Sequence, residues 1–175
     1  MLAVFAIGLV SPSNAQPWSA TEPAVELQQT DFSCGLAALA NTLIRLGSWQ
    51  GSEAQLLGVG ESIGVSSATA KVAGYSMAEL LAIARTQGFD GVGLRLDMAG
   101  LVTMQPPFIV RLETAAGGHF STVVEIIVRD RTERGVAVRL ADPTWGDVTL
   151  DAAAFAALWL HQKSTTGVAL ALRRR

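Results

Sequence analysis

The chain is poor in cysteine and histidine, and this scarcity excludes several kinds of site. Its 175 residues include one cysteine, Cys34, and two histidines, His119 and His161. A single cysteine cannot form an intramolecular disulfide. These three residues also offer nothing like the ligand spacing of a zinc site. We therefore expect no metal and no other cofactor, and any thiol chemistry must fall to Cys34.

The chain also lacks an excess of either charge. It has 13 Lys and Arg residues against 15 Asp and Glu residues, which gives a formal net charge of −2. Proteins that bind nucleic acids carry basic patches that neutralise phosphates. The one basic cluster here is the terminal run Arg173-Arg174-Arg175, which we interpret as a solvated end. We therefore expect no nucleic-acid partner.

An uninterrupted apolar run, Leu2 to Val10 (LAVFAIGLV), is followed by Pro12 and the small residues Ser13-Asn14-Ala15. This pattern predicts a secretory signal peptide over residues 1–15, and the alternative is a buried N-terminal segment. No Lys or Arg precedes Arg45, so we interpret the first residue as lying inside a longer signal. The run is too short to span a bilayer. We expect an exported protein, periplasmic or extracellular, without a transmembrane span.

Patterning over the rest of the chain predicts one α+β domain. Residues 16–25 are interpreted as an irregular lead-in to a single domain over residues 26–175. Helical spacing comes first and strand-like Val and Ile runs come second, which favours N-terminal helices packed on an antiparallel sheet. A Gly- and Ser-rich loop is expected up to Gly74. The expected helices are 34–46, 53–57, 77–87, 101–104 and 152–160, and the expected strands are 108–113, 119–129, 136–141 and 168–172.

Cys34 lies where the first expected helix begins. Apolar residues recur at helical spacing from Cys34 to Leu46, and Asp31 or Ser33 is expected to cap the start. A helix N-terminus stabilises a thiolate through its N–H groups and dipole, so this position suits a nucleophile. Gly35 is interpreted as leaving room for a substrate backbone. The alternative is that Cys34 is a small buried apolar residue, as most free cysteines are.

His119 and Asp142 are the candidate partners of the thiol. His119 follows two glycines at the opening of an expected strand, where its imidazole can accept the thiol proton and return it to a leaving group. Asp142 ends the next expected strand, so its carboxylate can bond the far ring nitrogen and fix the imidazole. The alternatives are a structural histidine and an ordinary Asp-Pro turn. His161 has no polar surroundings and is interpreted as structural.

Two glutamines precede the cysteine. The amide of Gln29, five residues before Cys34, can donate a hydrogen bond to the oxyanion of a tetrahedral intermediate. The Cys34 backbone N–H would be the second donor. We therefore predict Gln29 as the oxyanion-hole residue. Gln28 is adjacent, and it is the alternative for the same role.

Three blocks of the sequence resemble peptidase family thirty-nine of the cysteine type, the bacteriocin-processing, double-glycine-leader peptidases. The blocks are Gln29 to Leu39 (QTDFSCGLAAL), Gly118-His119-Phe120 leading into Val123-Val124, and Ala141-Asp142-Pro143 with Gly146. They arrive in the family's order, and the similarity runs from Glu26 to about Leu172. The resemblance implies a papain-like fold. It also implies Cys34 as nucleophile, His119 as base, Asp142 as the residue that orients His119, and Gln29 at the oxyanion hole.

Well-known members of that family are domains of membrane ABC exporters that cut leader peptides after Gly-Gly in the cytoplasm. Because we expect an export signal here, and see no ATPase or membrane domain in these 175 residues, the chain is more similar to stand-alone, secreted relatives. The resemblance therefore implies peptidase activity, but it does not imply that this chain cuts leader peptides.

The resemblance implies a cysteine peptidase that hydrolyses peptide bonds. We expect a polypeptide substrate, such as an exported precursor with Gly or Ala just before the cut, and an export or ABC transport system as a partner. Two alternatives stay open. The same residues could carry another acyl transfer, amidase or transglutaminase-like, on envelope substrates. The fold could also serve as a non-catalytic binding or assembly module.

Overall fold

The computed structural model describes residues 22–47, 49–129, 135–160 and 164–175. The expected signal peptide over residues 1–15, the lead-in up to residue 21 and His161 lie outside these ranges, so those interpretations stay predictions. The chain from Glu22 to Ser33 forms no helix or strand. Within the described ranges, no helix has the length and apolar character needed to cross a membrane.

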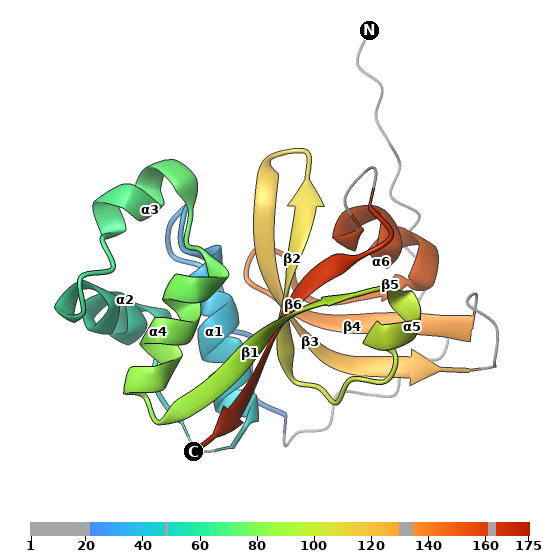
Figure 1. The fold of residues 1–175 in the computed structure, drawn as a ribbon, viewed down its shortest axis with the longest axis horizontal. Helices are drawn as coiled ribbons and strands as arrows, with labels where there is room; N and C mark the ends of the chain where they lie inside the picture. Colours follow the sequence, from blue (N-terminus) through green and yellow to red (C-terminus); the bar gives the residue numbers. More distant parts are fainter. Residues whose placement is uncertain (1–21, 48, 130–134, 161–163) are drawn as a thin grey trace, which may run out of the picture.

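Four helices follow one another along the chain and form one side of the molecule (Figure 1). They are α1 (Cys34–Arg45), α2 (Glu53–Ser62), α3 (Ser67–Ala73) and α4 (Met77–Thr86). α1 is buried along most of its length because α2 and α4 pack on one side of it and β3 (Gly117–Val128) packs on the other. α4 begins at a capping box, in which Ser76 and Glu79 exchange side-chain to backbone hydrogen bonds.

The other side of the molecule is a six-stranded antiparallel sheet in the order β1-β6-β2-β3-β4-β5. Besides β3, its strands are β1 (Phe89–Leu96), β2 (Phe108–Thr114), β4 (Val136–Asp142), β5 (Gly146–Asp151) and β6 (Gly167–Arg174). The short helix α5 (Met98–Leu101) follows β1, and α6 (Ala152–Trp159) connects β5 to β6. Asp151 begins α6, since its carboxylate accepts the Ala154 N–H at 2.8 Å.

Both faces of the sheet are buried because side chains alternate along its strands. On one face, Ile109 and Leu170 join the apolar side chains of α1, α2 and α4. On the other face, Val110 packs with Phe155 and Trp159 of α6. The helices therefore enclose the sheet, with the first four on one face. This arrangement confirms the expected α+β class, with N-terminal helices packed on an antiparallel sheet.

The structure differs from the sequence prediction in four places. The loop expected up to Gly74 contains the end of α2 and all of α3. Gly60 lets α2 pack closely against α4, because a Cβ at that position would lie 3.1 Å from the Ile83 side chain. The sequence pattern does not predict β1 or β5. The expected helical turn before Pro106 lies three residues earlier, as α5, because the Asp97 carboxylate caps its start.

Candidate active site

The first residue of α1, Cys34, is the centre of the candidate site. The turn before it is fixed by the buried Ser33, whose hydroxyl donates to Thr30 O at 2.9 Å and accepts the Thr30 N–H at 3.1 Å. With its hydroxyl used in this way, Ser33 makes no capping bond to α1, and the expected cap is not formed. The N–H groups of the first turn lack intrahelical acceptors. The thiol therefore lies at the positive end of an uncapped helix.

The surroundings of Gly35 indicate a packing role. They do not indicate the substrate-facing role expected from the sequence. Gly35 is buried, and a Cβ there would lie 3.2 Å from Tyr75 Cβ and 3.3 Å from the side chains of Leu80 and Phe120. Real Cβ atoms rarely have neighbours this close. Glycine thus lets α1 approach α4 and β3 closely, and this approach brings Cys34 to the start of β3.

His119 and Asp142 are bonded to each other across neighbouring strands. Because β3 and β4 pair antiparallel, with Thr122 opposite Ala141, the start of β3 meets the end of β4. The His119 Nε2–H donates to the Asp142 carboxylate, with Nε2 2.9 Å from Oδ2 and 3.1 Å from Oδ1. Asp142 is fully buried, and the His119 side chain is 12% exposed. The bond fixes the imidazole and leaves its Nδ1 for a second partner.

The loop after β4 holds the Asp142 carboxylate in place. Its Oδ1 accepts the backbone N–H groups of Thr144 at 2.8 Å and of Trp145 at 3.0 Å. The Trp145 ring lies 5.7 Å from the His119 ring, centroid to centroid, at an interplanar angle of 43°. The indole therefore stands beside the imidazole.

The second partner of His119 is Cys34. Burial raises the pKa of the Cys34 thiol. Four interactions lower this pKa and together outweigh burial. They are the hydrogen bonds with the His119 side chain and with the Phe120 N–H, the charge of His119, and the hydrogen bond with the Gly35 N–H. The pKa of Cys34 therefore lies below the ordinary value of 9.0. Because Nε2 is bonded to Asp142, Nδ1 is the ring nitrogen left to serve the sulfur.

The charges of the three groups support one another. Burial lowers the pKa of His119, but the hydrogen bonds with Asp142 and Cys34 and the charges of both raise it from 6.5 to about 9. Burial raises the pKa of Asp142. The pKa nevertheless lies below 3.8, because His119 bonds the carboxylate and carries a charge, and because the N–H groups of Trp145 and Thr144 also bond it. The arrangement favours a thiolate beside an imidazolium, with a carboxylate behind it.

Two buried threonines join α1 to β3 close to these groups. The Thr122 hydroxyl of β3 donates to Ala38 O of α1 at 2.8 Å, and the Thr42 hydroxyl donates to the same oxygen at 3.0 Å. Thr122 lies three residues after His119, and Ala38 lies four after Cys34. Sequence reasoning gives these threonines no role. The link helps to place the helix that begins at Cys34 along the strand that carries the imidazole.

Gln28 contacts both sides of the site. Its amide nitrogen donates to Thr30 O at 3.0 Å, in the turn before Cys34. Its amide oxygen accepts the Thr144 hydroxyl at 3.0 Å, in the loop after Asp142. The sequence offers no signal for the role of Thr144 beyond its place next to Pro143. The side chain of Gln28 is therefore part of the surroundings of the site.

Gln29 is held through its backbone. Its N–H donates to the Glu53 carboxylate of α2 at 2.9 Å, and the N–H of Glu53 donates to the Glu26 carboxylate at 3.0 Å. Glu53 is buried, whereas Gln29 is exposed. Of the two glutamines, Gln28 is the one whose side-chain contacts lie at the site.

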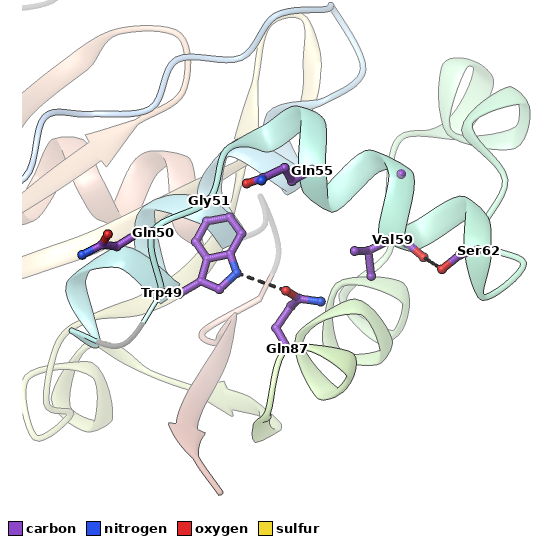
Figure 2. Close-up of a pocket in the computed structure, with 8 residues that line it drawn as sticks. Trp49, Gln50, Gly51, Gln55, Val59, Ser62 and Gln87 are labelled. Carbon is purple, nitrogen blue, oxygen red and sulfur yellow. Dashed lines mark hydrogen bonds between the residues drawn. The ribbon is translucent and has the colours of Figure 1, made fainter.

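A cavity of about 630 Å³ lies between α2 and the end of α4, and none of the residues above lines it (Figure 2). Four of its polar side chains already bond one another or the backbone. Trp49 Nε1 donates to Gln87 at 3.1 Å, the Ser62 hydroxyl donates to Val59 O at 2.7 Å, and Gln55 accepts a backbone N–H at 2.9 Å. We assign this cavity no chemistry. The residues that line it are Trp49, Gln50, Gly51, Gln55, Gly58, Val59, Ser62 and Gln87.

Comparison with known proteins gives a family and two curated relatives. The model of the Peptidase C39 family matches residues 23–170. The chain is similar to the probable functional amyloid protease FapD of Pseudomonas fluorescens, at 29% identity over 132 residues, and to that of Pseudomonas aeruginosa, at 30% over 132 residues. Each match covers 75% of this chain and 55% of the relative, so the chain spans about half the length of these relatives.

Solved structures share the fold. The peptidase domain of Streptococcus ComA, a bi-functional ABC transporter involved in a quorum sensing pathway, matches with a TM-score of 0.66 and 19% identity over 87% of this chain and 98% of that chain. A double glycine motif protease from an AMS/PCAT transporter, in complex with the leader peptide, matches with a TM-score of 0.64 and 21% identity, over 89% and 96%. These likenesses confirm the expected papain-like fold.

Proposed function

Because the chain belongs to the Peptidase C39 family, we propose that it is a cysteine peptidase that hydrolyses peptide bonds through Cys34, His119 and Asp142. Cys34 is the nucleophile, His119 is the general base and acid, and Asp142 orients His119. One observation carries this proposal, namely the position of the imidazole. It is bonded through Nε2 to a buried carboxylate, and it interacts with the Cys34 thiol at a helix N-terminus.

The reaction is an acyl transfer through sulfur. The Cys34 thiolate attacks the peptide carbonyl carbon, and the carbonyl electron pair moves to the oxygen. The tetrahedral adduct collapses, the C–N bond breaks, and His119 gives its Nδ1 proton to the leaving amine. Water then attacks the thioester while the neutral His119 takes one of its protons. The C–S bond breaks, the acid product leaves, and the thiolate and imidazolium are restored.

The oxyanion of each adduct needs hydrogen-bond donors. We assign the Cys34 backbone N–H and the side-chain amide of Gln28, which the sequence left as the alternative to Gln29. An amide nitrogen carries two hydrogens, and Gln28 uses one on Thr30 O. The other can serve the oxyanion. Gln29 contacts α2 through its backbone, so its amide is the less favoured donor.

The proposed substrate is an exported polypeptide precursor with Gly or Ala just before the cut, and the proposed partner is an export or ABC transport system. The solved neighbours support this choice, because one is a double glycine motif protease with its leader peptide and another comes from an ABC transporter. The curated relatives are named as functional amyloid proteases, which makes an amyloid-forming precursor a candidate. With the signal expected in the sequence, the reaction would take place in the periplasm or outside the cell.

The test compares the wild type with Cys34→Ala on denatured secreted proteins, and mass spectrometry identifies the new N-termini. We expect the wild type to cut after Gly or Ala and to lose this activity after alkylation with iodoacetamide. Cys34→Ala should produce no cuts while keeping its circular dichroism spectrum, since only one small side chain is removed. Turnover that survives the substitution or the alkylation would overturn the proposal. Products joined to an added amine, in place of free acids, would favour the transglutaminase-like alternative.

A further inference from the structure

The loop after Asp142 and the segment before Cys34 are joined by the side chain of Gln28. Its amide nitrogen faces Thr30 O, a carbonyl oxygen that can only accept, so the nitrogen must be on that side. The amide oxygen then faces the Thr144 hydroxyl, which must donate to it at 3.0 Å. The two contacts therefore fix which end of the amide points which way.

Thr144 bonds two side chains of the proposed site, Asp142 and Gln28. Its backbone N–H donates to Asp142 Oδ1 at 2.8 Å, and its hydroxyl donates to Gln28. A further bond joins the same segments, because the Gln28 N–H donates to Pro143 O at 2.9 Å. One residue thus bonds the carboxylate that orients the imidazole and the amide assigned to the oxyanion.

We propose that the Thr144 hydroxyl is a positioning group that holds the Gln28 amide with its nitrogen toward the oxyanion. This inference rests on the proposed function. Without the hydroxyl, the amide oxygen loses its partner and only the bond to Thr30 O opposes rotation of the amide; a rotated amide would present its oxygen to the oxyanion. An acceptor in that position repels the negative charge that develops in the transition state. The hydroxyl therefore acts on the rate of the chemical step more than on substrate binding.

The proposal is tested with Thr144→Val, which keeps the shape and removes the donor, and with Thr144→Ser, which keeps the donor. We expect Thr144→Val to lower kcat about tenfold, with KM within about twofold of wild type. Thr144→Ser should retain most of kcat. Thr149→Val, at an exposed threonine of β5, is the matched control and should behave as the wild type.

A double-mutant cycle shows whether Thr144 acts through Gln28. In the Gln28→Ala background, Thr144→Val should have no further effect on kcat, because there is no amide left to orient. Gln29→Ala should leave the effect of Thr144→Val unchanged. Equal losses from Thr144→Val with and without Gln28, or equal kcat values for the Val and Ser variants, would overturn the proposal.

A measurement without turnover separates this inference from the proposed function. In NMR spectra, the Gln28 side-chain amide of the wild type should show slow hydrogen exchange, and Thr144→Val should speed this exchange severalfold while Thr149→Val does not. If the wild type cleaves no peptide but shows this pattern, the proposed function fails and the positioning contact stands. If the exchange is the same in Thr144→Val and the wild type, the positioning contact fails whatever the activity.

Discussion

The proton on His119 depends on the negative charges around it. Asp142 accepts from Nε2 at 2.9 Å, and the hydrogen bonds and charges of Asp142 and Cys34 raise the pKa of His119 from 6.5 to about 9 against the effect of burial. In the proposed reaction His119 must give a proton to the leaving amine. The alkaline limit of activity should therefore follow the pKa of His119.

We predict that Asp142→Asn keeps some turnover and moves the alkaline limb of the kcat/KM profile from about pH 9 toward 6.5. The imidazole remains, but the anion that stabilises its protonated form is gone. The profile is measured from pH 5 to 10 on one peptide. Asp147→Asn is the control, since Asp147 bonds Arg139 at 2.9 Å and not His119. An alkaline limb that stays in place would remove Asp142 from the proposed role.

Residues with distinctive chemistry could be found in the sequence, and residues with a role set by their neighbours could not. Cys34 and His119 are rare residue types in this chain, next to glycines and at the start of expected elements. The role of Gly35 could not be predicted, because only the folded structure shows that Tyr75 and Leu80 pack against it. Thr144 is an ordinary loop residue until the fold brings Gln28 to its hydroxyl.

At the scale of elements, the placement of α1 along β3 sets the distance between the thiol and the imidazole. This placement depends on Ala38 O, which accepts from Thr122 of β3 and from Thr42 of α1 itself. Thr122 links the two elements directly through its bond to Ala38 O, whereas the Thr42–Ala38 bond stays within the helix. The Thr42 hydroxyl adds to the link, because it lies 3.2 Å from the Thr122 hydroxyl, and both side chains are buried.

We predict that Thr122→Val lowers the free energy of unfolding by about 1 kcal/mol and lowers kcat by a larger factor than Thr42→Val does. Valine keeps the volume, but α1 loses its polar link to β3 and the sulfur is less well placed beside His119. Urea unfolding and steady-state kinetics measure the two effects. Thr42→Val is the comparison, because it removes the Thr42–Thr122 contact but leaves the Thr122–Ala38 bond in place. Equal losses of kcat in both variants would show that the Thr122–Ala38 bond has no special role in placing the sulfur.

Element prediction from the sequence succeeded where one pattern dominates. The apolar, strand-like run of β2 and the apolar spacing of α1 are such cases, and both elements lie where they are expected. β1 was missed because it contains Gly91 and Gly93, which weaken the strand pattern. It exists because it pairs with β6 along its whole length. β5 likewise has polar residues at alternate positions and lies at the edge of the sheet. It is stabilised by its pairing with β4.

At the scale of the whole molecule, contacts between distant parts of the chain join the two sides around the site. Arg139 on β4 lies 3.1 Å from the Glu22 carboxylate and 2.9 Å from that of Asp147. Asn41 of α1 bonds the N–H and the carbonyl oxygen of Glu26. Glu22 and Arg139 are 117 positions apart, so no local pattern could have paired them. The segment before α1 is therefore part of the fold around the site.

The charges of the site link its protonation to the stability of the whole fold. The raised pKa of His119 adds stability that is fully present below pH 6.5 and is lost as the pH rises through about 9. The lowered pKa of Cys34 adds stability that is present above pH 9.0 and is lost as the pH falls through the folded value. Between pH 6.5 and 9 these two contributions change in opposite directions, so they partly cancel in the wild type.

We predict that Cys34→Ala reveals the contribution of His119 alone. Without the thiol, the free energy of unfolding should fall by roughly 1 to 3 kcal/mol as the pH rises above 6.5. The fall should end below pH 9, because Asp142 is then the main group that raises the pKa of His119. Urea unfolding at half-unit pH steps measures it, with the wild type showing a shallower change. In the double variant Cys34→Ala/Asp142→Asn, the free energy of unfolding should change little over this pH range, because the imidazole has lost both anions. If the free energy of unfolding of Cys34→Ala changes equally little, His119 is not held protonated by Asp142, and the charge arrangement proposed for the reaction fails with it.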